Sequence, residues 1–157
     1  MDYFTRAWAL GELTDSEFDG ALANYHDYIG SFDPNSSVRR FATAISLNDA
    51  WVDRFIFRPD QLSLTLLTGD IQRGYWSTEI NYVGARIVLG EDALKQAVQH
   101  RPTEIWYDEF SGRPAHMVHR FLLVGPHGTE DRGEVHIEFE DLNFSETRAD
   151  GRMLPSL

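Results

Sequence analysis

Apolar and ionisable residues alternate strictly within the stretch GEVHIEFED, residues 133–141. Successive side chains of a β-strand point to opposite faces of a sheet, so a period of two residues predicts a strand with one apolar and one charged face. A pairing slip of one residue would turn every apolar side chain toward water, and this fixes the register. The chain is therefore expected to build a sheet with one buried side, and the opposite side carries the candidate catalytic residues His136, Glu138 and Glu140.

The same alternation runs through most of the chain after residue 50, where turn residues divide it into strands. The predicted strands are LSLTL at 62–66, YWSTEINYVGARIVL at 75–89, EIWYDEF at 104–110, HMVHRFLLV at 116–124 and EVHIEFEDLNF at 134–144. A helix near 91–100, EDALKQAVQH, separates the second strand from the third. The other connections are too short for the crossovers that parallel strands need, so we expect antiparallel pairing.

Residues 14–32 have a helical period instead. Their apolar side chains recur at spacings of three and four, at Phe18, Leu22, Tyr25, Ile29 and Phe32. Thr14, followed three residues later by Glu17, predicts a capping box at the start of this helix. Such a stripe is typical of a helix packed on a core.

Pro34 ends this helix, because proline lacks the amide proton that a helix interior needs. A second helix is predicted after it, since apolar residues again recur at helical spacing. Its buried side would be formed by Val38, Phe41 and Ile45, with Arg39 and Arg40 toward solvent.

The order of these elements predicts an α+β fold, an antiparallel sheet of about five strands with N-terminal helices packed on one face. A chain of 157 residues suits one domain, so we expect a single domain over residues 1–157. Residues 1–50 would be mainly helical and residues 51–145 mainly antiparallel sheet with the helix near 91–100. Residues 146–157 show no pattern and are predicted to form a loose tail.

The charge of the chain argues against nucleic-acid binding. The formal net charge is −11, and of the 14 Lys and Arg residues only Lys95 is lysine. No basic stripe exists that would displace counterions from a phosphate backbone, so the sequence predicts no nucleic-acid partner. A field of this sign speeds the encounter with a cationic protein. A basic protein is therefore the kind of partner that the charge favours.

Several other classes of site are also excluded. The chain has no cysteine, which rules out disulfides, thiolate nucleophiles and cysteine-ligated metal sites. It has no phosphate-binding loop, dinucleotide-binding motif or nucleophile elbow, and no cofactor is predicted. The longest apolar runs, such as FLLV at 121–124, are far too short to span a membrane, and the N-terminus does not read as an export signal. We expect a cytoplasmic protein without a membrane partner; the sequence does not indicate an oligomeric state.

Two histidine pairs could in principle hold a metal ion. His116 and His119 are three residues apart on a predicted strand, so their side chains should point to opposite faces. The remaining candidate metal ligands are His119 and His136, which would face each other across the last hairpin with a nearby glutamate as an oxygen ligand.

The register of the last hairpin decides this second pair. Phe121 shares a face with Val135 only if odd-numbered positions oppose odd-numbered positions, and His119 then faces the core while His136 faces away. With the hairpin centred on the loop 126–132, Arg120 stands opposite Glu138 on the outer face. The register therefore predicts that the two imidazoles do not meet.

The turns offer a binding surface, because loops on a rigid sheet are common recognition sites. The segments SGRPAH at 111–116 and GPHGTEDRG at 125–133 mix Gly, Pro, Arg and acidic residues. The candidate binding residues in or beside these turns are Arg113, His116, Arg120 and His127.

Six short motifs resemble those of a family of small bacterial proteins classed as a domain of unknown function. They are YFT at 3–5, LNDAWVD at 47–53, YVGA at 82–85, YDEF at 107–110, HRFLL at 119–123 and IEFEDL at 137–142. Members of that family often have His-Asp where this chain has Asn48 and Asp49, so a catalytic histidine at that position is not shared. The resemblance implies a bacterial cytosolic protein and brings no activity with it.

Two functions follow as hypotheses. The first is a non-enzymatic, acidic interaction module that binds another protein, such as an immunity or antitoxin protein that covers a cationic toxin. The alternative is a hydrolase or metal-dependent enzyme that uses His136, Glu138 and Glu140 on the sheet face, with His119 or Glu109 as a further candidate. The alternative requires these groups to converge in one concave site. A third role, as a structural subunit or ligand-binding domain of a larger assembly, also stays open.

Overall fold

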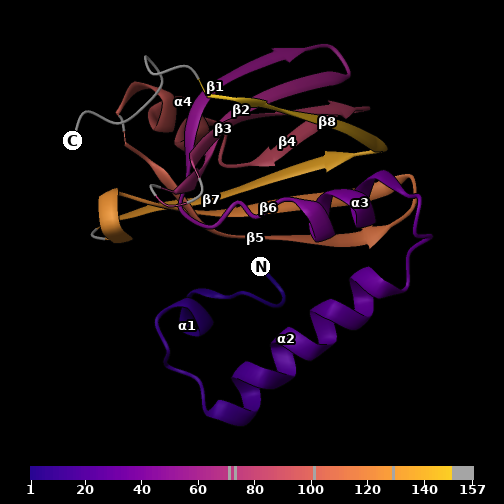
Figure 1. Ribbon diagram of the computed structural model, residues 1–157, viewed down its shortest axis with the longest axis vertical. Coiled ribbons are helices and arrows are strands. Elements are labelled where there is room, and N and C mark those ends of the chain that lie inside the picture. The colour runs from indigo at the N-terminus through magenta and orange to yellow at the C-terminus, as the bar shows by residue number, and fades with distance from the viewer. Residues whose placement is uncertain (71, 73, 101, 129, 150–157) are drawn as a thin grey trace.

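The computed structural model of the protein describes residues 1–70, 72, 74–100, 102–128 and 130–149, with the side chain of His127 left out. Its helices are α1 (Arg6–Ala9), α2 (Asp15–Gly30), α3 (Ser37–Ala44) and α4 (Glu91–Gln99), with a 3₁₀ turn η1 (Pro126–Gly128). Its strands are β1 (Ala50–Arg58), β2 (Gln61–Asp70), β3 (Gly74–Val83), β4 (Arg86–Leu89), β5 (Glu104–Arg113), β6 (His116–Val124), β7 (Asp131–Phe139) and β8 (Asp141–Arg148) (Figure 1). No described helix has both the length and the apolar composition needed to cross a bilayer.

All eight strands belong to one antiparallel sheet in the order β4-β7-β6-β5-β1-β2-β3-β8. The predicted α+β class is therefore correct, but the prediction of about five strands is wrong. Strand β1 was missed because its apolar residues are adjacent in AWVDRFIFR instead of alternating. Each of the predicted strands 75–89 and 134–144 is bent and counts as two strands, β3 with β4 and β7 with β8.

The two outermost strands close the sheet. Strand β3 pairs with β8 and β4 with β7, and the register from Trp76 opposite Arg148 to Ile87 opposite Ile137 continues across both bends. The bent segment β3–β4 thus pairs with the bent segment β7–β8 along one antiparallel ladder. Because β3 and β8 stand at one end of the strand order and β4 and β7 at the other, this ladder joins the two ends of the sheet. The bend in β3–β4 lies at Gly84, where φ is +64° and an added Cβ would come within 2.6 Å of the Glu140 side chain. Only glycine fits there without strain.

Helices cover both faces of this sheet, which corrects the expectation of helices on one face. On the inner face, odd-numbered residues of β6 join the main core, and the Phe41 ring of α3 lies 5.7 Å from the rings of Phe110 and His119. On the outer face, the N-terminal segment and α1 pack on β5, where Trp8 meets Tyr107 edge-on at 4.8 Å. Both faces of β5 and β6 are therefore covered. Alternation of apolar and polar residues predicts instead that one face of each strand is exposed to water.

Helix α2 lies along the open edge of β5. Strand β5 pairs with β1 only at Ala50 and Trp51, which leaves the rest of that edge without a strand partner among the described residues. The Tyr25 hydroxyl accepts a hydrogen bond of 3.0 Å from the Phe110 amide, and the Tyr28 hydroxyl donates one of 3.0 Å to the Gly112 carbonyl. The first bond satisfies an edge amide of the buried residue Phe110, and both bonds fix α2 against the sheet.

The structure confirms the predicted start of α2 but not the whole of the predicted C-terminal tail. The predicted capping box is present, with Thr14 and Glu17 bonded to each other's backbone amides. The tail predicted for residues 146–157 is wrong for its first part, because residues through Arg148 pair with β3 as strand β8. Residues 150–157 lie outside the described part of the chain.

Candidate functional site

Two adjacent acidic residues of β5 point to opposite faces of the sheet. Asp108 points to the inner face and Glu109 to the outer face, because neighbouring residues of a strand alternate. The Glu109 side chain is fully buried, and 20% of the Asp108 side chain is exposed. Two separate polar networks result, one built on each acid.

The inner network links three side chains in the core. The Nε2 atom of His119 lies 2.9 Å from the Asp108 carboxylate, and its Nδ1 atom lies 2.8 Å from the Tyr82 hydroxyl. An ionised carboxylate only accepts hydrogen bonds, so this pattern assigns the proton to Nε2 and makes Nδ1 the acceptor from Tyr82. The ring stacks on Phe110 with centroids 3.9 Å apart. Two hydrogen bonds and one stacked ring thereby fix His119 in one orientation and one tautomer.

Burial keeps this network neutral at His119 and Tyr82. Loss of hydration lowers the pKa of His119 below 6.5, and the hydrogen bond and charge of Asp108 only partly offset this. Burial also raises the pKa of Tyr82 well above 10. The His119 ring is completely buried, so it does not touch a molecule bound at the surface. The arrangement suits a structural network better than acid–base catalysis on a substrate.

A pH dependence of stability follows from the lowered pKa of His119. The unfolded chain takes up a proton at this residue below pH 6.5, whereas the folded chain resists it. Stability due to His119 is thus fully present above pH 6.5 and is lost as the pH falls, by at most about 1.4 kcal/mol per pH unit. Urea unfolding at pH 7.5 and at lower pH, on the protein and on His119→Leu, isolates this effect. We expect the stability difference between the two proteins to shrink as the pH falls; a constant difference would contradict the assignment.

The outer network holds the N-terminal segment on the sheet. The Glu109 carboxylate accepts hydrogen bonds from the backbone amides of Asp2, Tyr3 and Phe4, the last two at 2.9 Å. Arg120 lies opposite Glu109 on β6, 3.3 Å from its carboxylate and 2.6 Å from that of Asp2. One buried carboxylate therefore compensates a cation and three amides.

His136 belongs to neither the inner nor the outer network. It faces outward on β7 opposite Arg120, and its Nε2 atom lies 2.9 Å from the Glu134 carboxylate. Burial by itself would raise the pKa of Glu134, but the hydrogen bond from His136 and the nearby Met1 ammonium lower it overall. His119 and His136 thus occupy opposite faces, as the odd-to-odd register predicts.

The predicted pairing of Arg120 with Glu138 is wrong by two residues. The hairpin closes at Val124 and Asp131, earlier than expected, and a bulge follows between Leu123 and Val124. Glu138 consequently stands opposite Val118 and forms an ion pair with Arg86 of β4. Odd-numbered residues still oppose odd-numbered residues, because the shift is an even number of residues.

The remaining sequence candidates do not converge. Glu140 is exposed at the bend between β7 and β8, away from His136 on the face of β7. Arg113 and His116 are exposed and paired at the turn between β5 and β6, whereas Arg120 is half-buried in the outer network. His127 falls in η1, and its side chain lies outside the described residues. Within the described residues, no three His, Asp or Glu side chains are placed to hold one metal ion.

The structure shows a charged surface that analysis by motif missed. From residue 7 to residue 38 the chain has no Lys or Arg, although it has six acidic residues. All six are exposed on or beside α2 and form the acidic face: Glu12, Asp15, Glu17, Asp19, Asp27 and Asp33. None of them forms an ion pair with a described residue. The acidic face therefore carries more than half of the net charge of −11, and a count of charge by segment would have found it.

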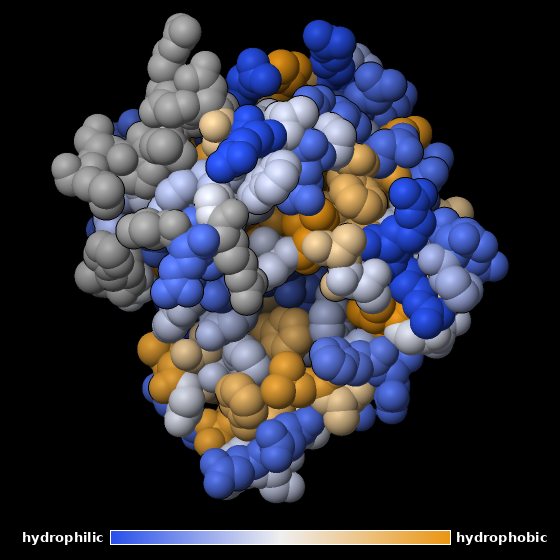
Figure 2. All heavy atoms as spheres, viewed as in Figure 1, coloured by the Kyte–Doolittle hydropathy of each residue, from blue (hydrophilic) through white to orange (hydrophobic). Residues whose placement is uncertain are grey.

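The acidic face lies on the outermost layer of the molecule. Helix α2 runs along the lower side of the molecule, beyond β5, where hydrophilic side chains are interspersed with apolar ones on the surface (Figures 1 and 2). Its apolar residues turn inward, with Tyr25 and Tyr28 bonded to the edge of β5. The acids are thus presented on a helix that is held firmly in place.

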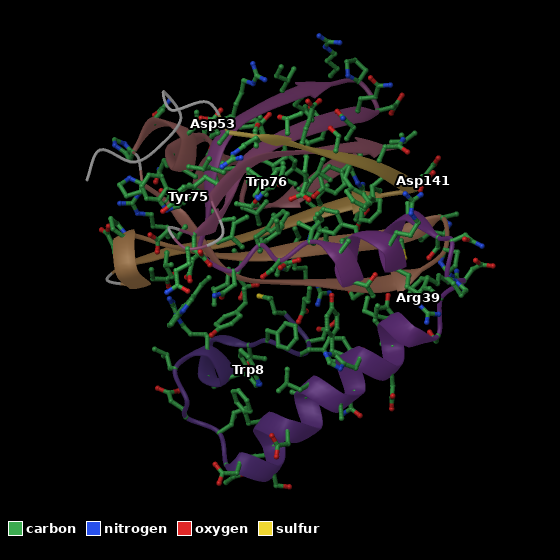
Figure 3. The ribbon with its side chains drawn as sticks, in the orientation of Figure 1. Trp8, Arg39, Asp53, Tyr75, Trp76 and Asp141 are labelled. Carbon is green, nitrogen blue, oxygen red and sulfur yellow. The ribbon has the colours of Figure 1, made fainter. Side chains whose placement is uncertain are left out.

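A groove of about 460 Å³ separates α2 from α3. It is lined by Tyr25, His26, Ile29, Gly30, Arg39, Ala42 and Thr43. Arg39 lies at the C-terminal end of α2, where its guanidinium donates to the carbonyls of Gly30 and Phe32 at 2.9 and 2.7 Å (Figure 3). This cap explains why Arg39 is partly buried, although the sequence predicted it on the solvent side. A second hollow, of about 430 Å³, lies between α4 and the start of β7 and has a polar lining.

Comparison of the chain with protein-family models, curated proteins and solved structures gives no match. This agrees with the resemblance to a family without an assigned activity, and it identifies no family for the chain. Tyr82, Asp108, Glu109 and His119 all lie in the short motifs on which that resemblance rests. The structure brings these motifs together around β5 and β6, where the residues bind each other and the N-terminal segment.

Proposed function

We propose that the protein is a non-enzymatic interaction module that binds a basic protein through the acidic face on α2. The observation that carries the proposal is the contrast between the two sets of ionisable residues. The ionisable residues of the inner and outer networks are bonded to one another or to the N-terminal segment, whereas the six acids of the acidic face are exposed and form no ion pair with a described residue. A rigid surface of one sign attracts and orients a partner of the opposite sign.

The sheet supports this proposal by fixing the helix that carries the charge. The capping box begins α2, Arg39 caps its C-terminal end, and two tyrosines bond its middle to β5. A partner therefore loses little conformational entropy of the module on binding, because the surface is already ordered. Neutralisation of a cationic toxin is one role of this kind.

We expect neutralisation of the acidic face to weaken the capture of a partner. The variant E12Q/D19N/D27N removes three exposed charges that make no described hydrogen bond and leaves the capping box intact. With the purified protein immobilised in lysate of its own cells, the triple variant should retain its partner about tenfold less well at low salt. Added salt should weaken binding of the unmodified protein more steeply, because exposed charges are screened.

The matched control removes three exposed acids elsewhere, in D60N/D92N/E140Q. It changes the net charge equally but leaves the acidic face untouched, so its partner should be retained. Equal loss in both variants would mean that net charge alone attracts the partner. Undiminished capture by E12Q/D19N/D27N, or no basic protein captured at low salt, would contradict the proposed function.

A further inference from the structure

Strand β1 has a free edge over residues 54–58. Its other edge pairs with β2, but β5 reaches β1 only at Ala50 and Trp51, followed by a bond of 3.2 Å from the Val52 amide to the Thr103 carbonyl. Residues 54–58 form no backbone hydrogen bond with a described residue outside β2. In the view of Figure 1, β1 runs along the upper side of the molecule, far from α2.

The backbone groups that point to this free edge belong to Phe55 and Phe57. A two-residue turn joins β1 to β2, and it is closed by Arg58 opposite Gln61. The closing pair of such a hairpin exchanges two hydrogen bonds, and residues along the strand then alternate between bonds to the partner strand and groups that face away from it. The amides and carbonyls of Phe55 and Phe57 therefore face outward, whereas those of Ile56 are directed to β2. Four backbone groups are thus open to a further strand.

The side chains beside these groups carry positive charge and exposed apolar surface. Arg54, Ile56 and Arg58 lie on the same face of β1, and Ile56 is 41% exposed. Phe57 lies on the other face and is 49% exposed. Both arginines are exposed, and neither forms an ion pair with a described residue. Their guanidinium groups are therefore open to an acidic partner.

Charge and spacing favour an acidic strand as the occupant of this edge. Arg54 and Arg58 are four residues apart, so an antiparallel strand with acids four residues apart meets both, and its middle residue lies beside Ile56. Asp53 and Asp60 flank the segment, outside the part with the free backbone groups. A second copy of β1 fits poorly, because a register centred on Ile56 places Arg54 of one copy opposite Arg58 of the other, and like charges repel.

We propose that β1 binds an extended acidic segment of another protein as a further antiparallel strand along residues 54–58. The backbone of that segment bonds to Phe55 and Phe57, and its carboxylates meet Arg54 and Arg58. In strand addition of this kind, backbone hydrogen bonds give affinity and side-chain contacts give specificity. The inference does not rest on the proposed function, because it concerns a different surface and a partner of the opposite charge.

Nine-residue peptides test the charge and the backbone bonds separately. The first has glutamate at positions 3 and 7 with valine at positions 4, 5 and 6, and in the second glutamine replaces both glutamates. Titration at about 0.15 M salt, where repulsion from distant acids is screened, should show that the glutamate peptide binds about fivefold more tightly, the effect of two exposed ion pairs. The amide protons of Phe55 and Phe57 should exchange more slowly in the complex, with that of Ile56 unchanged.

Methylation of single peptide nitrogens tests the strand geometry. In the antiparallel register, position 4 of the glutamate peptide lies opposite Phe57 and its amide faces β1, whereas the amide of position 5 faces away. Methylation of the position 4 nitrogen should therefore abolish binding, and methylation of the position 5 nitrogen should leave it in place. Equal weakening by the two methylations would overturn the inference.

A matched pair of variants tests the two arginines. R54E/R58E should lose the preference for the glutamate peptide, whereas R113E/R148E, which changes two other exposed arginines and the net charge equally, should keep it. Equal binding of the glutamate and glutamine peptides, or a preference that survives R54E/R58E, would overturn the inference. A dimer that slows exchange at Phe55 and Phe57 without peptide would assign the edge to a second copy and would also overturn it. E12Q/D19N/D27N should bind the glutamate peptide undiminished, so failure of the proposed function is a separate outcome.

Discussion

Replacement of Glu109 by alanine is expected to lower the free energy of unfolding by about 3–5 kcal/mol. The Glu109 carboxylate is fully buried and accepts hydrogen bonds from the amides of Asp2, Tyr3 and Phe4, and it also lies beside Arg120. Its removal leaves three amide donors, of which that of Phe4 is buried, without their acceptor and takes one of two carboxylates from Arg120, so desolvation costs are no longer offset. Urea unfolding followed by fluorescence measures the loss.

Two controls define the cause of that loss. Glu140→Ala removes an exposed acid for which no side-chain hydrogen bond is described, and it should change stability by no more than about 0.5 kcal/mol. Glu109→Gln keeps one carbonyl oxygen for the amides but loses the charge, so its effect should fall between the other two. A loss below about 1 kcal/mol in Glu109→Ala would show that the N-terminal segment is not held by this carboxylate.

His119→Leu is expected to destabilise the protein by about 2–3 kcal/mol, although leucine is the more apolar residue. The substitution removes the acceptor of the buried Tyr82 hydroxyl and the donor to Asp108, and it ends the ring stacking on Phe110. Tyr82 then has a buried hydroxyl without its partner. The effect should appear in both thermal and urea unfolding.

His136→Leu is the matched control for this second prediction. His136 lies on the same hairpin, but its side chain is 20% exposed and bonds only to the partly exposed Glu134. Its loss should cost less than about 1 kcal/mol. A larger loss for His136→Leu than for His119→Leu would contradict the placement of His119 in a buried network and of His136 on the outer face.

The sequence predicts the faces of the last strands well, because alternation is a local property. It places His119 toward the core and His136 away from it, and the structure agrees. It does not predict the partners of His119. Tyr82 reaches Nδ1 only because the bent segments β3–β4 and β7–β8 close the sheet, and the bend at Gly84 is not visible in a period of two.

The outer network was missed for a related reason. Glu109 and the amides that it binds are more than 100 residues apart in the chain, so no local pattern connects them. Alternation along β5 accounts only for the divergence of Asp108 and Glu109 to opposite faces. The odd-to-odd register places Leu122 on the outer face, yet this side chain is buried opposite Tyr107, where the N-terminal segment covers the sheet. When a segment folds back over a strand, both faces of the strand can be buried. The alternation of apolar and polar residues then no longer shows which face is exposed.

The acidic face could have been found from the sequence, since the absence of Lys and Arg from residue 7 to residue 38 is plain in it. The helical stripe of Phe18, Leu22, Tyr25 and Ile29 also fixes which side of α2 is buried, and Asp27 falls on the opposite side. Only the groove beside it required coordinates, because it depends on how α2 and α3 are placed.

The division of the histidines between the two faces is tested most directly by nuclear magnetic resonance of the imidazole nitrogens. We expect the His119 ring to be neutral with its proton on Nε2, and to remain so as the pH is lowered from 7.5 through 6.5, since burial lowers its pKa. A His119 ring that takes up a proton near pH 6.5, or that carries its proton on Nδ1, would contradict the buried network and reopen the enzymatic alternative.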